Sequence, residues 1–286
     1  MPIALITDFG TGSVYAGIMR GVIAALAPDV AVVDLTHEIA PQAVEEAGFL
    51  LASSYRYFPE GTVFAAVVDP GVGTGREVVL LEASARRFLA PDNGLLGPVI
   101  DREPGATARH VRTRRLFLEP LSATFHGRDV FAPVAARLAA GLDPREVGPS
   151  VPLGSLARAT GSAAPAAASS PSSPPPPPRP PRRVVHVDRF GNLVTDVPGA
   201  LFSRLAALEV AGRRVECGAR TYGEAPAGEP FFYVGSFDTV EVAVAGGDAA
   251  RAFGAGRGAA VRVHEGPVRG ALGAEPPEDE DRGSEP

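Results

Sequence analysis

Val67-Val68-Asp69-Pro70-Gly71-Val72-Gly73-Thr74-Gly75-Arg76-Glu77 is the stretch on which the interpretation of this chain depends. An apolar run from Thr62 to Val68 leads into it and predicts a buried strand that ends at a carboxylate. Its glycines permit backbone angles that other residues avoid, so Asp69 and Arg76 could face one another across a tight loop. Taken alone, the stretch is slightly better explained as a turn closed by a surface ion pair, which contributes little to stability.

The segments before this stretch alternate between strands and helices. Residues 3–7 predict a strand, a glycine turn follows, and apolar residues at helical spacing over 14–26 predict a helix. The same order repeats with a strand at 30–35 and a helix at 41–55. Such alternation predicts right-handed parallel units with helices on both faces of a sheet, and ligands then bind at the carboxyl ends of the strands. Acids occupy three of these strand ends: Asp8, Asp34 and Asp69.

The segment after the stretch adds a histidine to these acids. Further strands are predicted at residues 78–82 and 88–90, and the second runs into a polar cluster at 91–94. His126 lies in Thr124-Phe125-His126-Gly127-Arg128-Asp129, just before a helix predicted at 130–140. A lone histidine near a helix start is more often structural than catalytic, but the acids in the same domain favour a functional role for His126.

Changes of composition divide the chain into four segments. Residues 1–154 are predicted to form an N-terminal three-layer α/β/α domain with a mostly parallel sheet. Residues 155–183 are rich in Ala, Ser and Pro and are expected to form a disordered linker, because they cannot bury enough apolar surface to offset the entropy of ordering. Short alternating strands separated by turns over 184–272 predict a smaller, mostly antiparallel β domain. An acidic tail at 273–286 completes the chain.

Composition narrows the classes of function. The 286 residues are 45% hydrophobic, which supports a packed core, and the net charge of −6 comes largely from the tail. This charge argues neither for nor against nucleic acid, and we expect neither a nucleic-acid nor a membrane partner. Cys217 is the single cysteine, so we expect no internal disulfide and no zinc site of Cys/His spacing. Without a basic leader or a long apolar segment, the protein is expected to be cytoplasmic.

Familiar site patterns fit this chain poorly. Gly10-Thr11-Gly12 after the first strand suggests a dinucleotide site, but the third glycine position holds Tyr15, and Asp8 would repel a pyrophosphate. Asp8 suits the hydroxyl groups of a ribose, and a helix-capping role explains it equally well. The chain also lacks the Gly-x-Ser-x-Gly elbow of a serine hydrolase and the paired carboxylates of a glycosidase.

Seven motifs, in order through both predicted domains, resemble the S-adenosyl-L-methionine hydroxide adenosyltransferase family, which is related to the fluorinases and chlorinases. They are Thr7-Asp8-Phe9-Gly10, Val33-Asp34-Leu35-Thr36-His37-Glu38-Ile39, Val68-Asp69-Pro70-Gly71-Val72-Gly73, Ala90-Pro91-Asp92-Asn93-Gly94, Thr124-Phe125-His126-Gly127-Arg128-Asp129, Asp188-Arg189-Phe190-Gly191-Asn192 and Gly235-Ser236-Phe237. The sequence departs from many relatives at Ser13, where they carry an acid, and at Gly235, where they carry Asn.

The resemblance implies hydrolysis of S-adenosyl-L-methionine to adenosine and L-methionine without a metal or cofactor. It also implies a homotrimer whose active sites lie between the N-terminal domain of one subunit and the C-terminal domain of its neighbour. By similarity Asp69, Arg76 and His126 act on the attacking water. The resemblance places seven further residues around the substrate: Asp8 at the ribose, Asn192, Glu241 and the backbone near Val244 at adenosine, Phe190 stacked on adenine, and Asp188 and Ser236 at the methionine amino and carboxylate groups.

The implied chemistry suits these side chains. Attack on ribose C5′ expels a neutral thioether from a sulfonium cation, so a hydroxide-like nucleophile and the substrate neutralise one another in the transition state. Arg76 can stabilise hydroxide character on the water while Asp69 or His126 accepts the proton, and the sequence does not decide between these two bases. Two alternatives remain: a halogenase on the same scaffold, and a module that binds S-adenosyl-L-methionine or adenosine without turnover.

Overall fold

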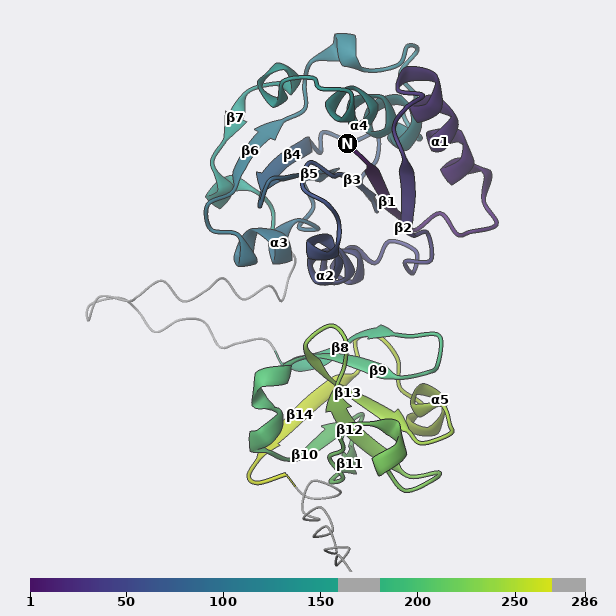
Figure 1. Ribbon diagram of the computed structural model, residues 1–286, viewed down its shortest axis with the longest axis vertical. Coiled ribbons are helices and arrows are strands. Elements are labelled where there is room, and N and C mark those ends of the chain that lie inside the picture. Colours follow the sequence, from purple (N-terminus) through teal and green to yellow (C-terminus); the bar gives the residue numbers. More distant parts are fainter. Residues whose placement is uncertain (159–180, 269–286) are drawn as a thin grey trace, which may run out of the picture. The chain divides into compact units, whose positions relative to one another are not determined.

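The computed structural model describes residues 1–158 and 181–268, which form two compact units divided between Arg179 and Pro180 (Figure 1). Most of the predicted linker and the whole predicted tail lie outside the described residues. The flanks of the predicted linker belong to the units: Leu156 is buried in the first core, and Arg182 begins the first strand of the second unit. Leu156 is apolar and Arg182 pairs with a neighbouring strand, so their backbones are ordered by packing and hydrogen bonds.

The first unit is built on a seven-stranded sheet in the order β2-β1-β3-β5-β4-β6-β7. Its strands are β1 (Ile3–Thr7), β2 (Val32–Thr36), β3 (Val63–Val67), β4 (Val78–Ala83), β5 (Arg86–Pro91), β6 (Thr107–His110) and β7 (Ser150–Val151). The prediction of a mostly parallel sheet holds for β2, β1, β3 and β5, whereas β4, β6 and β7 pair antiparallel, so the sheet is mixed. The reversal begins at Ser84-Ala85, where positive φ angles at both residues form a tight hairpin between β4 and β5.

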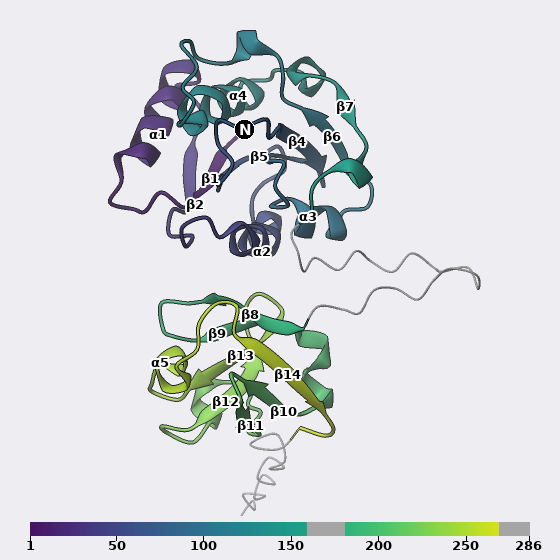
Figure 2. The ribbon, with the colours of Figure 1, turned by 180° about the vertical axis from the view of Figure 1, so that it is seen from behind.

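Helices cover both faces of this sheet, which confirms the three-layer prediction (Figures 1 and 2). One face packs against α2 (Val44–Ser54) and α3 (Gly97–Arg102), in a core that includes Phe64. The other face packs against α1 (Val14–Leu26) and α4 (Ala132–Ala139), in a core that includes Phe131. Alternate residues of β1 enter the two cores, as the period of two in a strand requires.

The second unit is a seven-stranded antiparallel sheet in the order β11-β10-β14-β8-β9-β13-β12, with one short helix, α5 (Ala249–Phe253). Its strands are β8 (Arg182–Val187), β9 (Leu193–Pro198), β10 (Leu205–Val210), β11 (Arg213–Val215), β12 (Pro230–Val234), β13 (Thr239–Val244) and β14 (Ala260–Glu265). Phe232 of β12 donates to the carbonyl of Cys217 at 2.9 Å and accepts from Ala219 at 3.0 Å, just beyond β11. The two sheet edges therefore meet, and the antiparallel prediction is confirmed as a near-barrel.

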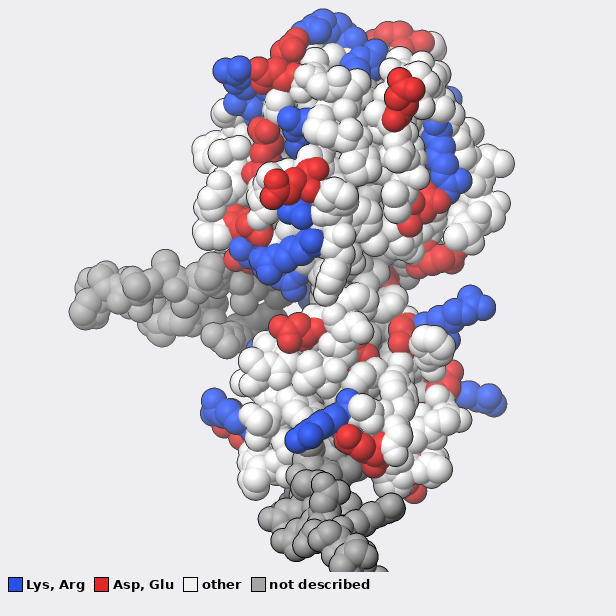
Figure 3. Space-filling view, viewed as in Figure 1, with Lys and Arg blue, Asp and Glu red and all other residues white. Residues whose placement is uncertain are grey.

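Charged side chains are distributed over the surface of the described residues. On the face seen in Figure 3, acidic and basic side chains of the described residues are interspersed and form no extended patch of one sign. Within residues 1–158 and 181–268, every helix is too short or too polar to cross a membrane.

Candidate active site

A hollow of about 290 Å³ opens at the carboxyl ends of the parallel strands in the first unit. β1 and β3 are neighbours with Thr7 opposite Val67, so the acids that follow these strands emerge at one edge of the sheet. The hollow is lined by both acids and by residues from two further loops, among them Asp8, Gln42, Asp69, Phe125 and His126. The predicted convergence of Asp8, Asp69 and His126 is thus present in the structure.

Asp69 and Arg76 form an ion pair that is almost entirely buried, with side-chain exposures of 5% and 9%. The loop between them is tight: the Gly71 N–H donates to Asp69 Oδ1 at 3.2 Å, and Gly73 adopts φ of 79°. A Cβ at Gly73 would overlap the carbonyl oxygen of Ala123, so glycine is required by close approach as well as by conformation. The interpretation of this stretch as a turn with a surface ion pair is therefore wrong.

Burial sets the protonation of the groups at the hollow. Desolvation raises the pKa of Asp69 above its ordinary value, although the Arg76 guanidinium opposes this. Desolvation also lowers the pKa of His126, and the charge of Arg76 lowers it further. The carboxylate becomes a stronger base than usual while the imidazole stays neutral at pH 7, so either group can accept a proton.

One donor at this site is unsatisfied. Arg76 Nε is buried and has no hydrogen-bond partner among the described residues, while the two terminal nitrogens bond to Asp69 and to the carbonyl of Glu77. A buried donor without an acceptor costs free energy, which a water molecule or ligand can remove. An oxygen atom bound at Nε would satisfy this donor.

The loop that carries His126 is fixed by its neighbour Asp129. A π-helical turn, Gly127–Phe131, begins directly after His126 and continues into α4, so the helical segment starts earlier than the predicted residue 130. Asp129 is buried, accepts from the Ser122 N–H at 2.8 Å and pairs with Arg128. Turns of this kind are frequent at functional sites, and this one holds His126 at the edge of the hollow.

Asp8 is held by a residue that the sequence did not single out. Asp8 Oδ2 accepts from the backbone N–H of Gln42 at 2.9 Å, and Gln42 adopts a positive φ of 63°. The capping interpretation of Asp8 is wrong, because Ser13 is the N-cap of α1 and accepts from the Tyr15 N–H. No local signal identifies Gln42, since neither glycine nor asparagine marks its left-handed backbone.

In the second unit, Asp188 closes the turn between β8 and β9. Its carboxylate accepts from the backbone of Phe190 and of Asn192 at 2.9 Å and from Asn192 Nδ2 at 2.7 Å. Asn192 is buried, whereas Phe190 at the tip of the turn is 76% exposed. The predicted group Asp188, Phe190 and Asn192 is therefore one structural unit with an aromatic ring presented to solvent.

Glu241 on β13 is a buried acid, and the charge of His186 opposes the effect of burial on its pKa. It is 5% exposed and accepts from the Tyr233 hydroxyl at 2.5 Å; burial raises its pKa, and the charge of Asp188 does so as well. A Cβ at Gly235 would overlap Glu241 Oε1, which explains why the chain carries glycine there. Ser236 is exposed on the turn between β12 and β13, and Val244 ends β13.

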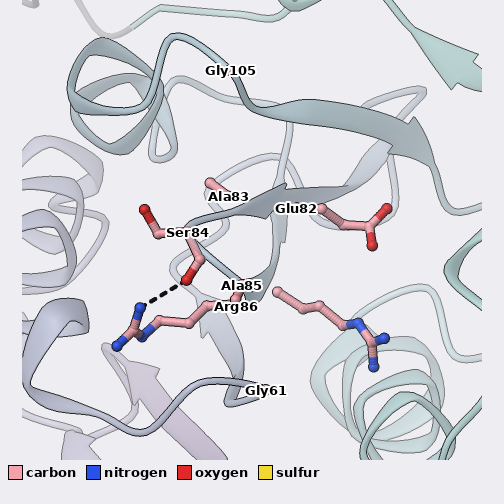
Figure 4. Close-up of a pocket in the computed structure, with 8 residues that line it drawn as sticks. Gly61, Glu82, Ala83, Ser84, Ala85, Arg86 and Gly105 are labelled. Carbon is pink, nitrogen blue, oxygen red and sulfur yellow. Dashed lines mark hydrogen bonds between the residues drawn. The ribbon is translucent and has the colours of Figure 1, made fainter.

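A second hollow, of about 310 Å³, lies at the opposite edge of the first unit's sheet (Figure 4). Its residues include Gly61, before β3, and Arg86, which begins β5, so it faces the amino ends of these strands. The Arg86 guanidinium donates to the carbonyls of Ser84 at 2.8 Å and Phe58 at 2.6 Å. Because this cation is occupied by the backbone, we assign the active site to the hollow at Asp69.

In residues 1–158 and 181–268, no three His, Cys, Asp or Glu side chains are grouped so that they could hold a metal ion.

The fold and this site define a two-domain protein in which an acid, an arginine and a histidine meet at the strand ends of an α/β unit that precedes a β near-barrel. Residues 3–148 match the SAM hydroxide adenosyltransferase N-terminal domain, and residues 182–262 match the corresponding C-terminal domain. The chain belongs to the SAM hydroxide adenosyltransferase family.

Two of the similar proteins match nearly the whole chain. An (R)-S-adenosyl-L-methionine hydrolase of Thermus thermophilus is 40% identical, over 92% of this chain and 99% of its own. A crystal structure of an uncharacterized conserved protein from Thermotoga maritima superposes with a TM-score of 0.79 at 32% identity, over 91% of this chain and 99% of its own. A fluorinase of Actinoplanes is 31% identical over 51% of this chain and 57% of its own, so the family is related to the fluorinases.

Proposed function

We propose that the protein hydrolyses (R)-S-adenosyl-L-methionine to adenosine and L-methionine. Family membership and the 40% identical hydrolase support this reaction. The observation that carries it is the buried Asp69–Arg76 pair beside His126, because it combines two candidate bases with a donor that has no partner among the described residues. Such a site can hold and deprotonate water away from bulk solvent.

In the proposed mechanism, water attacks ribose C5′ from the side opposite the sulfonium. The bond from the water oxygen to C5′ forms while the bond from C5′ to sulfur breaks, and the electron pair leaves on the neutral thioether of methionine. Arg76 stabilises the developing hydroxide, and Asp69 or neutral His126 takes the proton. Positive charge on the substrate is lost as the nucleophile loses its negative character, so exclusion of water favours the step.

The remaining predicted residues bind the substrate in this proposal. Asp8 accepts hydrogen bonds from the ribose hydroxyls. The others lie in the second unit, where adenosine is bound by Asn192, Glu241 and the backbone near Val244, with Phe190 stacked on adenine, and Asp188 and Ser236 bind the amino and carboxylate groups of methionine.

We further propose a cytoplasmic homotrimer, with each site formed by the first unit of one subunit and the second unit of its neighbour. The first unit carries apolar side chains that suit such an assembly: Val14, Tyr15 and Ile18 on α1 and Val33 on the edge strand β2 are all exposed. Clusters of exposed apolar side chains often mark protein interfaces. Sedimentation at micromolar concentration tests the trimer.

A product assay tests the reaction. Purified protein is incubated in ¹⁸O-water with the (R) or the (S) sulfonium epimer of S-adenosyl-L-methionine, with and without chloride or fluoride. The products are separated by chromatography and identified by mass spectrometry. The proposal predicts adenosine that carries ¹⁸O at its 5′-hydroxyl. A 5′-halo-adenosine as the main product would show a halogenase, and tight binding without adenosine release at stoichiometric enzyme would show a binding module.

A further inference from the structure

Two loops at the carboxyl ends of β1 and β2 are joined more closely than the parallel pairing of these strands requires. Four hydrogen bonds connect residues 7–11 to residues 37–42. They are Thr7 Oγ1 with His37 Nδ1 at 2.9 Å, the Gly10 N–H to the carbonyl of His37 at 2.8 Å, the Thr11 N–H to Glu38 Oε1 at 2.7 Å, and the Gln42 N–H to Asp8 Oδ2 at 2.9 Å.

The His37 ring lies at the centre of this connection and is only 3% exposed. Its Nε2 is 3.0 Å from Asp34 Oδ1, close enough for electrostatic attraction although the pair does not meet hydrogen-bond geometry. Thr7 Oγ1 already accepts from the Phe9 N–H at 3.2 Å, so its own hydrogen is available to Nδ1. The acid beside Nε2 favours the proton there. The ring is therefore a neutral acceptor for Thr7, and burial, which lowers the pKa of His37, favours the same neutral form.

These hydrogen bonds orient Asp8, the residue directly after Thr7. At one end of the segment 37–42 the histidine ring fixes the end of β1. At the other end Gln42 keeps a left-handed backbone that is unfavourable for a residue with a Cβ, and its N–H binds the Asp8 carboxylate. With Oδ2 bonded to this amide, Oδ1 is the oxygen left for a ligand in the hollow.

We propose that His37 is a positioning residue that aims the Asp8 carboxylate at the vicinal hydroxyls of the substrate's ribose. The inference rests on the proposed function, since it assigns Asp8 to a ribose. It predicts that the preference for adenosine over 2′,3′-dideoxyadenosine depends on a histidine that touches neither ligand.

Two substitutions at residue 37 separate this role from simple packing. In His37→Asn the amide oxygen can take the place of Nδ1 and accept from Thr7, whereas His37→Leu has a similar volume and no acceptor. Calorimetry should show that His37→Leu weakens adenosine binding about tenfold, the equivalent of one hydrogen bond, and leaves 2′,3′-dideoxyadenosine binding unchanged. His37→Asn should retain most of the preference, and His37→Leu should add nothing to Asp8→Ala, because both act through the same carboxylate.

Amide hydrogen exchange provides a readout that needs no ligand. The Gln42 amide should lose protection in His37→Leu and keep it in His37→Asn. If His37→Leu does not fold, Thr7→Val breaks the same bond and Thr7→Ser restores it. Equal losses for the two nucleosides, additive losses with Asp8→Ala, or unchanged protection at Gln42 would each overturn the proposal. Wild-type protein that binds adenosine and 2′,3′-dideoxyadenosine equally, while the Gln42 amide loses protection only in His37→Leu, would instead refute the assignment of Asp8 to ribose.

Discussion

The two units hold their acidic side chains in different ways. In the first unit the Asp69 carboxylate pairs with a buried guanidinium and lies beside a neutral imidazole, so either group can accept a proton. In the second unit Asp188 accepts three hydrogen bonds from its own turn, and Glu241 accepts a hydrogen bond from the Tyr233 hydroxyl. The arrangement in the first unit is suited to proton transfer, whereas the hydrogen bonds in the second unit hold the acidic side chains in a fixed position. The predictions below test this difference between the two units.

The largest effect is expected from Asp69→Asn in the first unit. Asparagine keeps the shape but cannot accept the proton or balance Arg76, so turnover should fall by about 10²- to 10⁴-fold. Adenosine binding should persist, because the acid acts on water. The matched control is Asp143→Asn, an exposed acid paired with Arg145 in the same unit, which should keep full turnover. Comparable rates for wild type and Asp69→Asn would remove Asp69 from the mechanism.

Arg76→Met should be the most destabilising of these substitutions. It leaves the Asp69 carboxylate buried without its partner, and the free energy of unfolding should fall by about 3–5 kcal/mol at pH 7. Urea unfolding followed by circular dichroism measures the change. The exposed pair offers the comparison: Arg145→Met should leave the unfolding midpoint where it is. The same small shift in both variants would mean that the Asp69 pair is solvated in solution.

Gly235→Ala tests the fixed shape of the second unit. Its added methyl group would overlap Glu241 Oε1, so the carboxylate must move from its bond with Tyr233 and the unfolding free energy should drop by about 1–3 kcal/mol. Gly223→Ala, where nothing lies near the new methyl group, should have little effect. The double variant Gly235→Ala, Glu241→Ala should recover part of the loss. If it recovers none, crowding at Glu241 is not the cause.

The pH dependence of kcat/KM compares the two candidate bases. Asp69 must be ionised to act, and burial raises its pKa above the ordinary 3.8; His126 must be neutral, and burial lowers its pKa below 6.5. Asp69 as the base therefore gives an acid limb above pH 3.8, and His126 as the base gives one below pH 6.5, each with a loss of about tenfold per pH unit below the limb. A limb that survives in His126→Gln belongs to Asp69. A limb above pH 6.5 that disappears in His126→Gln would contradict the effect of burial on His126, and a wild-type limb below pH 3.8 would contradict its effect on Asp69.

Strand ends and their acids were predictable from sequence because an apolar run that stops at an acid and a glycine turn predicts a buried strand and the point where it ends. Asp8 and Asp69 follow such runs, and parallel pairing brings them together. The hairpin at Ser84-Ala85 was missed because its positive φ angles are adopted without the usual Asn-Gly signal, which led to an overestimate of parallel pairing. The loop between Asp69 and Arg76 packs at Gly73 against the carbonyl of Ala123, a contact between distant segments that local patterns do not encode.

The smallest effect on stability is expected from Phe190→Ala in the second unit, which tests whether this exposed ring serves binding and not the fold. The ring is 76% exposed at the tip of a turn that Asp188 holds through backbone and Asn192 bonds, none of which involve the ring. The unfolding free energy should therefore change by less than about 0.5 kcal/mol. If the ring stacks on adenine, adenosine should nevertheless bind about tenfold more weakly, since base stacking on an aromatic side chain contributes roughly 1–3 kcal/mol. Phe190→Tyr, which keeps the stacking face, should bind as wild type does, and equal adenosine affinity for all three proteins would remove Phe190 from the binding site.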